Sequence, residues 1–262
     1  MKKTVQTIRK AKGKNPITAL TAYDAPTALL ASRAGIDLLL VGDSLGTTLL
    51  GFETTVQVKL EHILHHTAAV NRANPDSLLV ADLPFAHSHL SQSETLQSCA
   101  RLMQEGGAQA VKIEADASLA PKIQHIINAG IPVLGHIGLL PQRVHDLGGY
   151  RKFGKTQHEA VQLQEDALAL QEAGCFALLG EMIAPDVTAQ ITESLEVPFI
   201  GIGCGTHCDG QILVTTDLLG YPSQFNPSFV KTYANLEKTM TDAFQAYAEE
   251  VRNGTFPPPQ KP

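Results

Sequence analysis

The 262-residue sequence contains no long apolar segment. No hydrophobic run approaches the roughly 20 residues that a membrane-spanning helix needs. The start of the chain also lacks the apolar core of about 7–15 residues that defines a secretory signal. The basic segment Lys2–Lys14 is therefore expected to lie in a solvated N-terminal arm, residues 1–15, and not in a targeting peptide. These absences predict a cytoplasmic protein with no membrane partner.

Cysteine and positive charge are also scarce. The four cysteines include one close pair, Cys204 and Cys208, whereas a structural zinc site normally uses two such pairs, so reduced thiols are expected. Lys and Arg number 20 against 26 Asp and Glu, for a formal net charge of −6. Because nucleic-acid-binding domains usually carry a basic surface, no nucleic-acid partner is expected.

Eight short apolar runs recur along the chain and alternate with segments of helical periodicity. Eight βα units favour a single closed (β/α)₈ barrel of TIM type, an α/β fold, over an open doubly wound sheet of six or seven strands. One domain is expected over residues 1–262, with a loose C-terminal tail at 254–262. The predicted strands are 17–22, 37–41, 77–81, 110–113, 133–137, 176–180, 199–202 and 212–215, and the clearest helices are 56–71, 91–105, 158–172 and 229–251.

Polar residues gather at the C-terminal ends of the predicted strands. In (β/α)₈ enzymes that end of the barrel carries the active site, so residues far apart in the sequence are expected to meet there. Lys112 and Glu114 are two positions apart and therefore share one face of their strand. The residues of this set are Tyr23, Asp24, Asp43, Ser44, Asp82, Lys112, Glu114, His136 and Glu181.

Four carboxylates in this set accompany a single lysine. Carboxylates rarely end buried strands without a partner, and one lysine cannot balance four of them. A hard divalent cation such as Mg²⁺ is the natural complement of these carboxylates. Such an ion takes few protein ligands, so coordination positions remain for a bidentate α-keto acid. Enolate chemistry on such an acid needs one carboxylate away from the metal as a base. Glu181 is the best candidate because it follows the sixth strand, away from Asp43, Asp82 and Glu114.

Each residue also has an ordinary structural explanation when taken alone. An aspartate after a strand is often a helix N-cap or a turn residue. His136 could be a core histidine, Lys112 a structural ion-pair partner, and Tyr23 a cap on the barrel. The occurrence of all these residues in one array is what favours an active site.

At these residues the sequence resembles the ketopantoate hydroxymethyltransferase (3-methyl-2-oxobutanoate hydroxymethyltransferase) family. The similar segments follow one another over almost the whole chain, and only their combination is specific. They are LTAYD (20–24), VGDSLG (41–46), HTAAV (66–70), ADLPF (81–85), VKIE (111–114), GHIG (135–138) with PQ (141–142), and GIG (201–203) with DGQ (209–211).

The resemblance implies a barrel of the phosphoenolpyruvate-mutase and isocitrate-lyase type. It implies transfer of the one-carbon unit of 5,10-methylenetetrahydrofolate to 3-methyl-2-oxobutanoate, giving 2-dehydropantoate for pantothenate synthesis, by a homo-oligomer that is often a decamer. By matched position, the metal site would comprise Asp43, Asp82 and Glu114, the keto-acid site Asp43, Ser44, Asp82 and Lys112, and the catalytic residues Glu181, as proton acceptor, and His136.

The chain departs from the family pattern at Ala115, Leu140 and residues 151–154. None of these changes removes a proposed ligand or base. Two alternatives remain at this stage: another Mg²⁺-dependent lyase or mutase acting on a small α-keto acid, and a non-catalytic diverged homologue. Enzymes of the first kind commonly use a reactive cysteine on a mobile loop, and no cysteine lies at such a place. The intact carboxylates argue against the second.

Overall fold

The computed structural model describes residues 2–222 and 227–258. The chain forms two compact units, Met1–Leu213 and Val214–Pro262. The expectation that residues 1–262 behave as one domain stays a prediction. Among the described residues, no helix has both the length and the apolar character that crossing a membrane requires.

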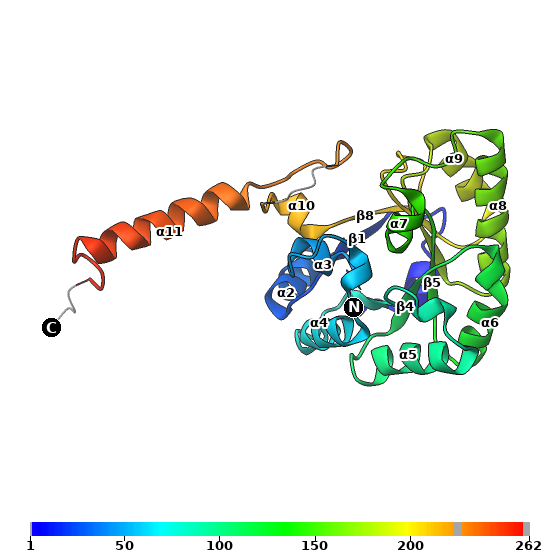
Figure 1. Cartoon of the computed structure of the whole chain (residues 1–262), viewed down its shortest axis with the longest axis horizontal. Coiled ribbons are helices and arrows are strands. Elements are labelled where there is room, and N and C mark those ends of the chain that lie inside the picture. Colours follow the sequence, from blue (N-terminus) through cyan, green and yellow to red (C-terminus); the bar gives the residue numbers. More distant parts are fainter. Residues whose placement is uncertain (1, 223–226, 259–262) are drawn as a thin grey trace. The chain divides into compact units, whose positions relative to one another are not determined.

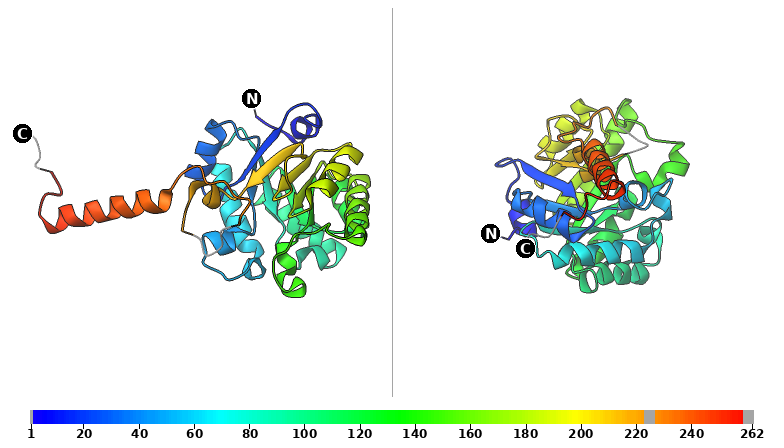
Figure 2. Two further views of the ribbon diagram at one scale, coloured as in Figure 1. Left: turned by 90° about the horizontal axis from the view of Figure 1, so that it is seen from above. Right: turned by 90° about the vertical axis from the view of Figure 1, so that its left-hand side faces the viewer.

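In the first unit, eight parallel strands close into a barrel. Each strand pairs with the next, and β1 (blue in Figure 2) pairs with β8 (yellow) to complete the circle. The predicted closed barrel is thus confirmed, and the open sheet is wrong. The strands are β1 (Ile17–Thr21), β2 (Leu38–Val41), β3 (Leu78–Asp82), β4 (Ala110–Glu114), β5 (Val133–Gly138), β6 (Ala177–Glu181), β7 (Phe199–Ile202) and β8 (Gly210–Leu213).

Strand β8 begins and ends two residues earlier than the predicted range 212–215. Val214, Thr215 and Thr216 are β-branched, which is typical of strands. In the structure, however, Val214 is the N-cap of helix α10 (Thr215–Leu219), so the two threonines belong to the helix. The β-branched run therefore spans a boundary between a strand and a helix.

Helices surround the barrel, as the ring of α4, α5, α6 and α8 in Figure 1 shows. The predicted helix over 91–105 is α5, and it begins with the expected cap, in which Ser91 Oγ accepts a hydrogen bond from Glu94 N. The helices of this unit are α1 (Val5–Arg9), α2 (Ala25–Arg33), α3 (Leu45–Thr48), α4 (Leu60–Arg72), α5 (Gln92–Gln104), α6 (Ala120–Asn128), α7 (Val144–Leu147), α8 (Gln157–Glu172) and α9 (Pro185–Ser194). Short 3₁₀ turns are η1 (Thr55–Gln57), η2 (His87–His89), η3 (Ala117–Leu119) and η4 (Pro141–Arg143).

Side chains that fill the barrel alternate along each strand with side chains that pack against the helices. On β3 the interior positions are Leu78 and Val80, and the next interior position is Asp82. On β4 an apolar interior residue is likewise followed by Lys112 and Glu114. The interior therefore changes from apolar to ionisable toward the C-terminal ends of the strands.

The predicted N-terminal arm is only partly solvated. Within residues 2–15, Ile8 of α1 is 2% exposed and belongs to the cluster that fills the barrel interior. Asp209, just before β8, accepts hydrogen bonds from Lys12 Nζ (2.9 Å), Gly13 N (3.1 Å) and Phe199 N (2.9 Å). The N-terminal segment therefore does not extend freely along its whole length, since Ile8 packs with the residues that fill the barrel interior.

The second unit contains α10 and α11 (Leu236–Arg252), the latter drawn in orange to red in Figure 1. All residues of α11 are described, and none of them is buried. Phe244, Tyr247 and Val251 are 63%, 58% and 46% exposed, and their spacing places them along one face of the helix. Of the predicted tail, residues 254–258 have no helix or strand, and 259–262 lie outside the described residues.

Candidate active site

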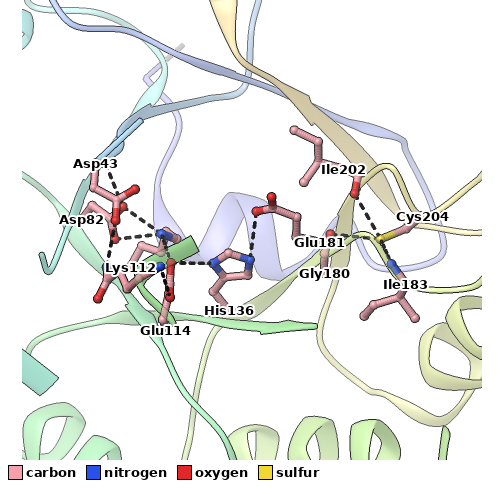
Figure 3. Close-up of polar contacts among 11 residues, drawn as sticks. Asp43, Asp82, Lys112, Glu114, His136, Gly180, Glu181, Ile183, Ile202 and Cys204 are labelled. Atoms are coloured by element: carbon pink, nitrogen blue, oxygen red, sulfur yellow. Dashed lines mark hydrogen bonds and ion pairs between the residues drawn. The ribbon is translucent and has the colours of Figure 1, made fainter. Parts of the chain in front are cut away.

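Asp82 and Lys112, on the neighbouring strands β3 and β4, form a buried ion pair at the C-terminal end of the barrel (Figure 3). Lys112 Nζ donates to both carboxylate oxygens, at 2.9 Å to Oδ1 and 2.8 Å to Oδ2. The backbone N–H of Asp43, two residues after β2, also donates to Asp82 Oδ2, at 3.0 Å. The barrel thus brings together three residues that the sequence predicted as one site.

Glu114, His136 and Glu181 continue this site along β4, β5 and β6. Glu114 Oε1 lies 3.8 Å from Lys112 Nζ and 3.8 Å from His136 Nδ1. The other ring nitrogen, His136 Nε2, lies 3.4 Å from Glu181 Oε2, so the imidazole stands between the two carboxylates (Figure 3). The Glu181 side chain is 20% exposed, against 4% for Glu114. Of these two carboxylates, Glu181 is the more accessible.

Ser44, Tyr23 and Asp24 occupy the rim beside Asp43. The Tyr23 hydroxyl and Ser44 Oγ are hydrogen-bonded at 2.8 Å, which holds the Ser44 side chain at the site. Asp24 Oδ1 accepts a hydrogen bond from Thr27 N at 2.8 Å and forms the N-cap of α2. The ordinary structural explanation therefore accounts for Asp24.

Burial dominates the electrostatics of the inner residues. It raises the pKa of Asp82 to about 7, against the attraction of Lys112, and raises the pKa of Glu114 well above its ordinary value. Burial works to lower the pKa of Lys112, but Asp82, Asp43 and Glu114 raise this pKa above its ordinary value, so the ammonium group stays charged. Burial also lowers the pKa of His136 well below its ordinary value, so the imidazole is neutral at pH 7.

Glu181 has the electrostatic character of a general base. Burial raises its pKa to about 7, and the attraction of Lys112 offsets only part of this effect. A base is most effective when its pKa lies near the working pH. Among the described residues, no hydrogen bond or ion pair joins Glu181 to the Asp43, Asp82 and Lys112 group.

The carboxylates suit a hard divalent cation in donor type and charge. Within residues 2–222 and 227–258, no three His, Cys, Asp or Glu side chains are arranged to hold a metal ion. Both oxygens of Asp82 accept hydrogen bonds from Lys112 Nζ. Glu114 Oε1, however, is buried and accepts no hydrogen bond from the described residues. Mg²⁺ keeps several waters and needs few protein ligands. Asp43, Asp82 and Glu114 therefore fit this ion by chemistry, although they are not gathered around one point.

Cys204 holds the turn that carries Glu181. Its buried Sγ lies 3.1 Å from Gly180 O, to which it donates, and accepts a hydrogen bond from Ile183 N at 3.4 Å (Figure 3). These two contacts lie on either side of Glu181 and Met182. Met182 has φ 52°, a left-handed conformation that is uncommon outside glycine. The thiol thus helps to fix a strained backbone beside the predicted base.

None of the four cysteines, all of them described, has the character of a reactive nucleophile. All are free thiols. Burial raises the pKa of Cys99, Cys175 and Cys208 to about 12 and that of Cys204 to about 11. Because a reactive cysteine needs a lowered pKa, these values disfavour a lyase or mutase that depends on a thiolate.

The turn η4, after β5, adds Gln142, for which the sequence predicted no role. Gln142 is 7% exposed, and its side-chain Nε2 donates to Asp43 Oδ2 at 2.9 Å. Its only signal in the sequence was its place in the PQ segment of the family-like pattern. Leu140 is the N-cap of η4 and makes no side-chain capping bond.

The divergent segment 151–154 lies against the turn that follows Glu181. Phe153 N donates to Met182 O at 2.8 Å, and Ala184 N donates to Phe153 O at 2.9 Å. Arg151 lies over the Phe153 ring, 3.9 Å from its centroid. The segment is therefore hydrogen-bonded to Met182 and Ala184, which follow Glu181, so its sequence bears on the turn next to that residue.

Comparison with known sequences identifies close relatives. The profile of the ketopantoate hydroxymethyltransferase family matches residues 2–259. The 3-methyl-2-oxobutanoate hydroxymethyltransferase of Moorella thermoacetica (strain ATCC 39073 / JCM 9320) is 51% identical over 241 residues, which cover 92% of this chain and 90% of the relative. The protein of the same name from Thermoanaerobacter sp. (strain X514) is 49% identical over 252 residues, which cover 96% of this chain and 92% of the relative.

Solved structures with a similar fold are far more distant in sequence. A 2,3-dimethylmalate lyase, a member of the PEP mutase/isocitrate lyase superfamily, has a TM-score of 0.61 at 16% identity and covers 100% of this chain and 91% of its own. A phosphonopyruvate hydrolase in complex with oxalate and Mg²⁺ has a TM-score of 0.62 at 15% identity, with coverage of 96% and 88%. At this level of identity the likeness shows the fold alone, a barrel of the kind found in that superfamily.

Proposed function

This chain belongs to the ketopantoate hydroxymethyltransferase family, and we propose that it transfers a hydroxymethyl group from 5,10-methylenetetrahydrofolate to 3-methyl-2-oxobutanoate. Membership makes the chain a hydroxymethyltransferase, and the names of its relatives support this keto acid as the acceptor. The folate donor rests on the family resemblance of the sequence. The product would be 2-dehydropantoate, for pantothenate synthesis.

We propose that Asp43, Asp82 and Glu114 hold Mg²⁺ next to the keto acid. A distant protein of the same fold forms a complex with oxalate and Mg²⁺, and an α-keto acid presents two adjacent oxygens in a similar way. When bound, the ion would polarise the keto group and favour the enolate. Ser44, fixed by its hydrogen bond at 2.8 Å, and the charged Lys112 would contact the keto acid from the same side.

Water would break the two C–N bonds of the folate methylene bridge, which releases tetrahydrofolate and leaves the one-carbon unit at the oxidation level of formaldehyde. Glu181 would remove the proton from C3 of the keto acid, and the electron pair of that C–H bond would form the new C–C bond to this carbon as its C=O π bond breaks. The proton held by the Glu181 carboxylate would then pass to the resulting alkoxide, giving the hydroxyl of the product and restoring the base. The neutral His136, 3.4 Å from Glu181 Oε2, would keep the base beside the substrate site.

One observation carries this assignment: the carboxylates fall into two groups. Asp43 and Asp82 are joined around Lys112 at the ends of β2 and β3, whereas Glu181 stands across His136 with a pKa of about 7. The first group has the charge to hold a cation, and the second has the pKa of a base. A non-catalytic protein would have no need of this division.

The test is exchange of the C3 proton of 3-methyl-2-oxobutanoate in D₂O, followed by NMR with Mg²⁺ present, before and after addition of methylenetetrahydrofolate. We expect exchange first and 2-dehydropantoate after the folate is added. Exchange without product would retain enolate formation and refute the folate donor. Folded protein that gives neither would refute the proposal.

We also propose that the protein is a cytoplasmic homo-oligomer, in keeping with the decamers of the family it resembles. The exposed face of α11 formed by Phe244, Tyr247 and Val251 supports association, because such a face on a helix with no buried residue gains stability when a second copy covers it. The four free thiols are in keeping with a reducing compartment.

A further inference from the structure

Gln142 contacts the ends of three strands that carry the candidate metal ligands. Its Nε2 donates to Asp43 Oδ2 at 2.9 Å, beyond β2, and to Leu83 O at 3.0 Å, beyond β3. Its backbone N–H donates to Glu114 Oε2 at 3.2 Å, at the end of β4. A single residue from the turn after β5 therefore bonds to all three elements.

The chemistry of these partners fixes the orientation of the amide. A carboxylate and a carbonyl oxygen are both acceptors, so the NH₂ group of Gln142, and not its oxygen, must face Asp43 and Leu83. Both of its N–H donors are then used. The side chain is 7% exposed, which leaves little room for water to take over these bonds.

These contacts determine which carboxylate oxygens remain available. Gln142 engages Oδ2 of Asp43 and Oε2 of Glu114. The other oxygen of Glu114, Oε1, is buried and accepts no hydrogen bond from the described part of the chain. Holding one oxygen of a carboxylate fixes the direction in which its second oxygen points. Gln142 thus sets the orientation of two of the three candidate ligands.

We propose that Gln142 is a positioning residue whose side chain orients Asp43 to receive a divalent cation and the keto acid, while its backbone N–H holds Glu114. This role rests on the proposed function of the site. Residues that hydrogen-bond to metal ligands fix the geometry of those ligands, and their loss typically weakens metal binding by about 10–100-fold. Gln142 acts through the carboxylates and is not itself a ligand.

Gln142→Met tests the proposal because methionine keeps the length of the side chain and removes both donors, while the backbone bond to Glu114 can remain. Mg²⁺ binding would be measured by calorimetry in the presence of 3-methyl-2-oxobutanoate. We expect about 10–100-fold weaker binding and a rate that raised Mg²⁺ largely restores. Gln171→Met is the matched control, because Gln171 also makes two hydrogen bonds, to Glu196 N and Val197 N, outside the site. Its Mg²⁺ affinity should stay at the wild-type value.

Equal Mg²⁺ affinity in wild type and Gln142→Met would overturn the positioning role and leave the proposed function intact. Wild-type protein that binds neither Mg²⁺ nor the keto acid would instead overturn the proposed function, and the positioning role with it. If Gln142→Met does not fold, Gln142→Asn decides, since it keeps the amide but is too short to bond both Asp43 and Leu83. Wild-type affinity in that variant would refute the proposal.

Discussion

Glu181 combines a raised pKa with partial exposure, and both properties follow from its place as the last residue of β6. Its interior position buries the carboxylate enough to raise the pKa to about 7, while its place at the strand end leaves the side chain 20% exposed. Glu181→Gln should lower kcat by about 10²–10⁴-fold, as is typical for loss of a general base. Keto-acid affinity, measured by calorimetry, should change little. Unchanged turnover would show that another group is the base.

The pH dependence of the rate follows from the same pKa. Only the ionised carboxylate can accept a proton, so the wild-type rate should rise with pH and level off above about 7. The rate of Glu181→Gln should lack this rise with pH. If the variant keeps a rise at the same pH, a different group is responsible for it.

The stability of the protein should respond to pH in the opposite sense. The pKa of Glu181 rises from an ordinary 4.5 to about 7 in the folded state, so folding favours the protonated form. Its contribution is complete below pH 4.5 and is lost as pH rises to about 7. Glu181→Gln should therefore have a higher Tm than wild type at pH 8. The difference in Tm between the variant and wild type should be smaller at pH 4.5. Equal Tm differences at the two pH values would contradict this account.

The Asp82 and Lys112 pair should matter for both stability and binding. Asp82→Ala leaves the buried Lys112 ammonium without its closest partner, which typically costs about 3–5 kcal/mol in the free energy of unfolding. Urea unfolding measures this loss, and Mg²⁺-dependent keto-acid binding should weaken as well. Glu105→Ala, which breaks the exposed pair with Arg101, is the control and should change little. Titration curves that match wild type would remove Asp82 from the metal site.

At the scale of the elements, Asp209 joins the N-terminal segment to β7 and β8 through three hydrogen bonds at the N-terminal end of the barrel. Asp209→Ala should lower the free energy of unfolding by about 3 kcal/mol, because hydrogen bonds to charged groups are the stronger ones. Keto-acid affinity should stay unchanged, since the candidate site lies at the opposite end of the strands. A large loss of affinity in the folded variant would show that the two ends of the barrel are coupled.

The strands and helices also show how much of the structure can be predicted from the sequence alone. The eight strands were predictable because most of them are short apolar runs. The set Asp43, Asp82, Lys112 and Glu114 followed from the polar residues within or just after β2, β3 and β4. Strand β8 was misplaced because the β-branched Thr215 and Thr216 start a helix. Burial of Ile8 could not be predicted, since it depends on a long-range contact under the barrel. The role of Gln142 was also hidden, because its partners lie 59 and 99 residues away.

At the scale of the whole molecule, the exposed face of α11 bears on assembly. If a second copy covers this face, Phe244→Ser with Tyr247→Ser should shift the protein from a large homo-oligomer to smaller species. Light scattering coupled to size-exclusion chromatography would measure this against the 28.1 kDa of one chain. Lys238→Ser with Asp242→Ser, on an exposed ion pair of the same helix, is the matched control. A monomeric wild type would refute the proposed assembly.

The alternation of side chains along the strands has a consequence for how the barrel tolerates change. Asp82, Lys112 and Glu114 lie on the same interior face of their strands as apolar residues earlier on β3 and β4. Deleting one residue early in β4 would rotate Lys112 and Glu114 outward and turn Val111 and Ile113 inward. Loops between strands can lose or gain residues without this exchange. Over evolution, length changes should therefore accumulate in the loops. The number of residues between the start of a strand and its catalytic end should stay constant.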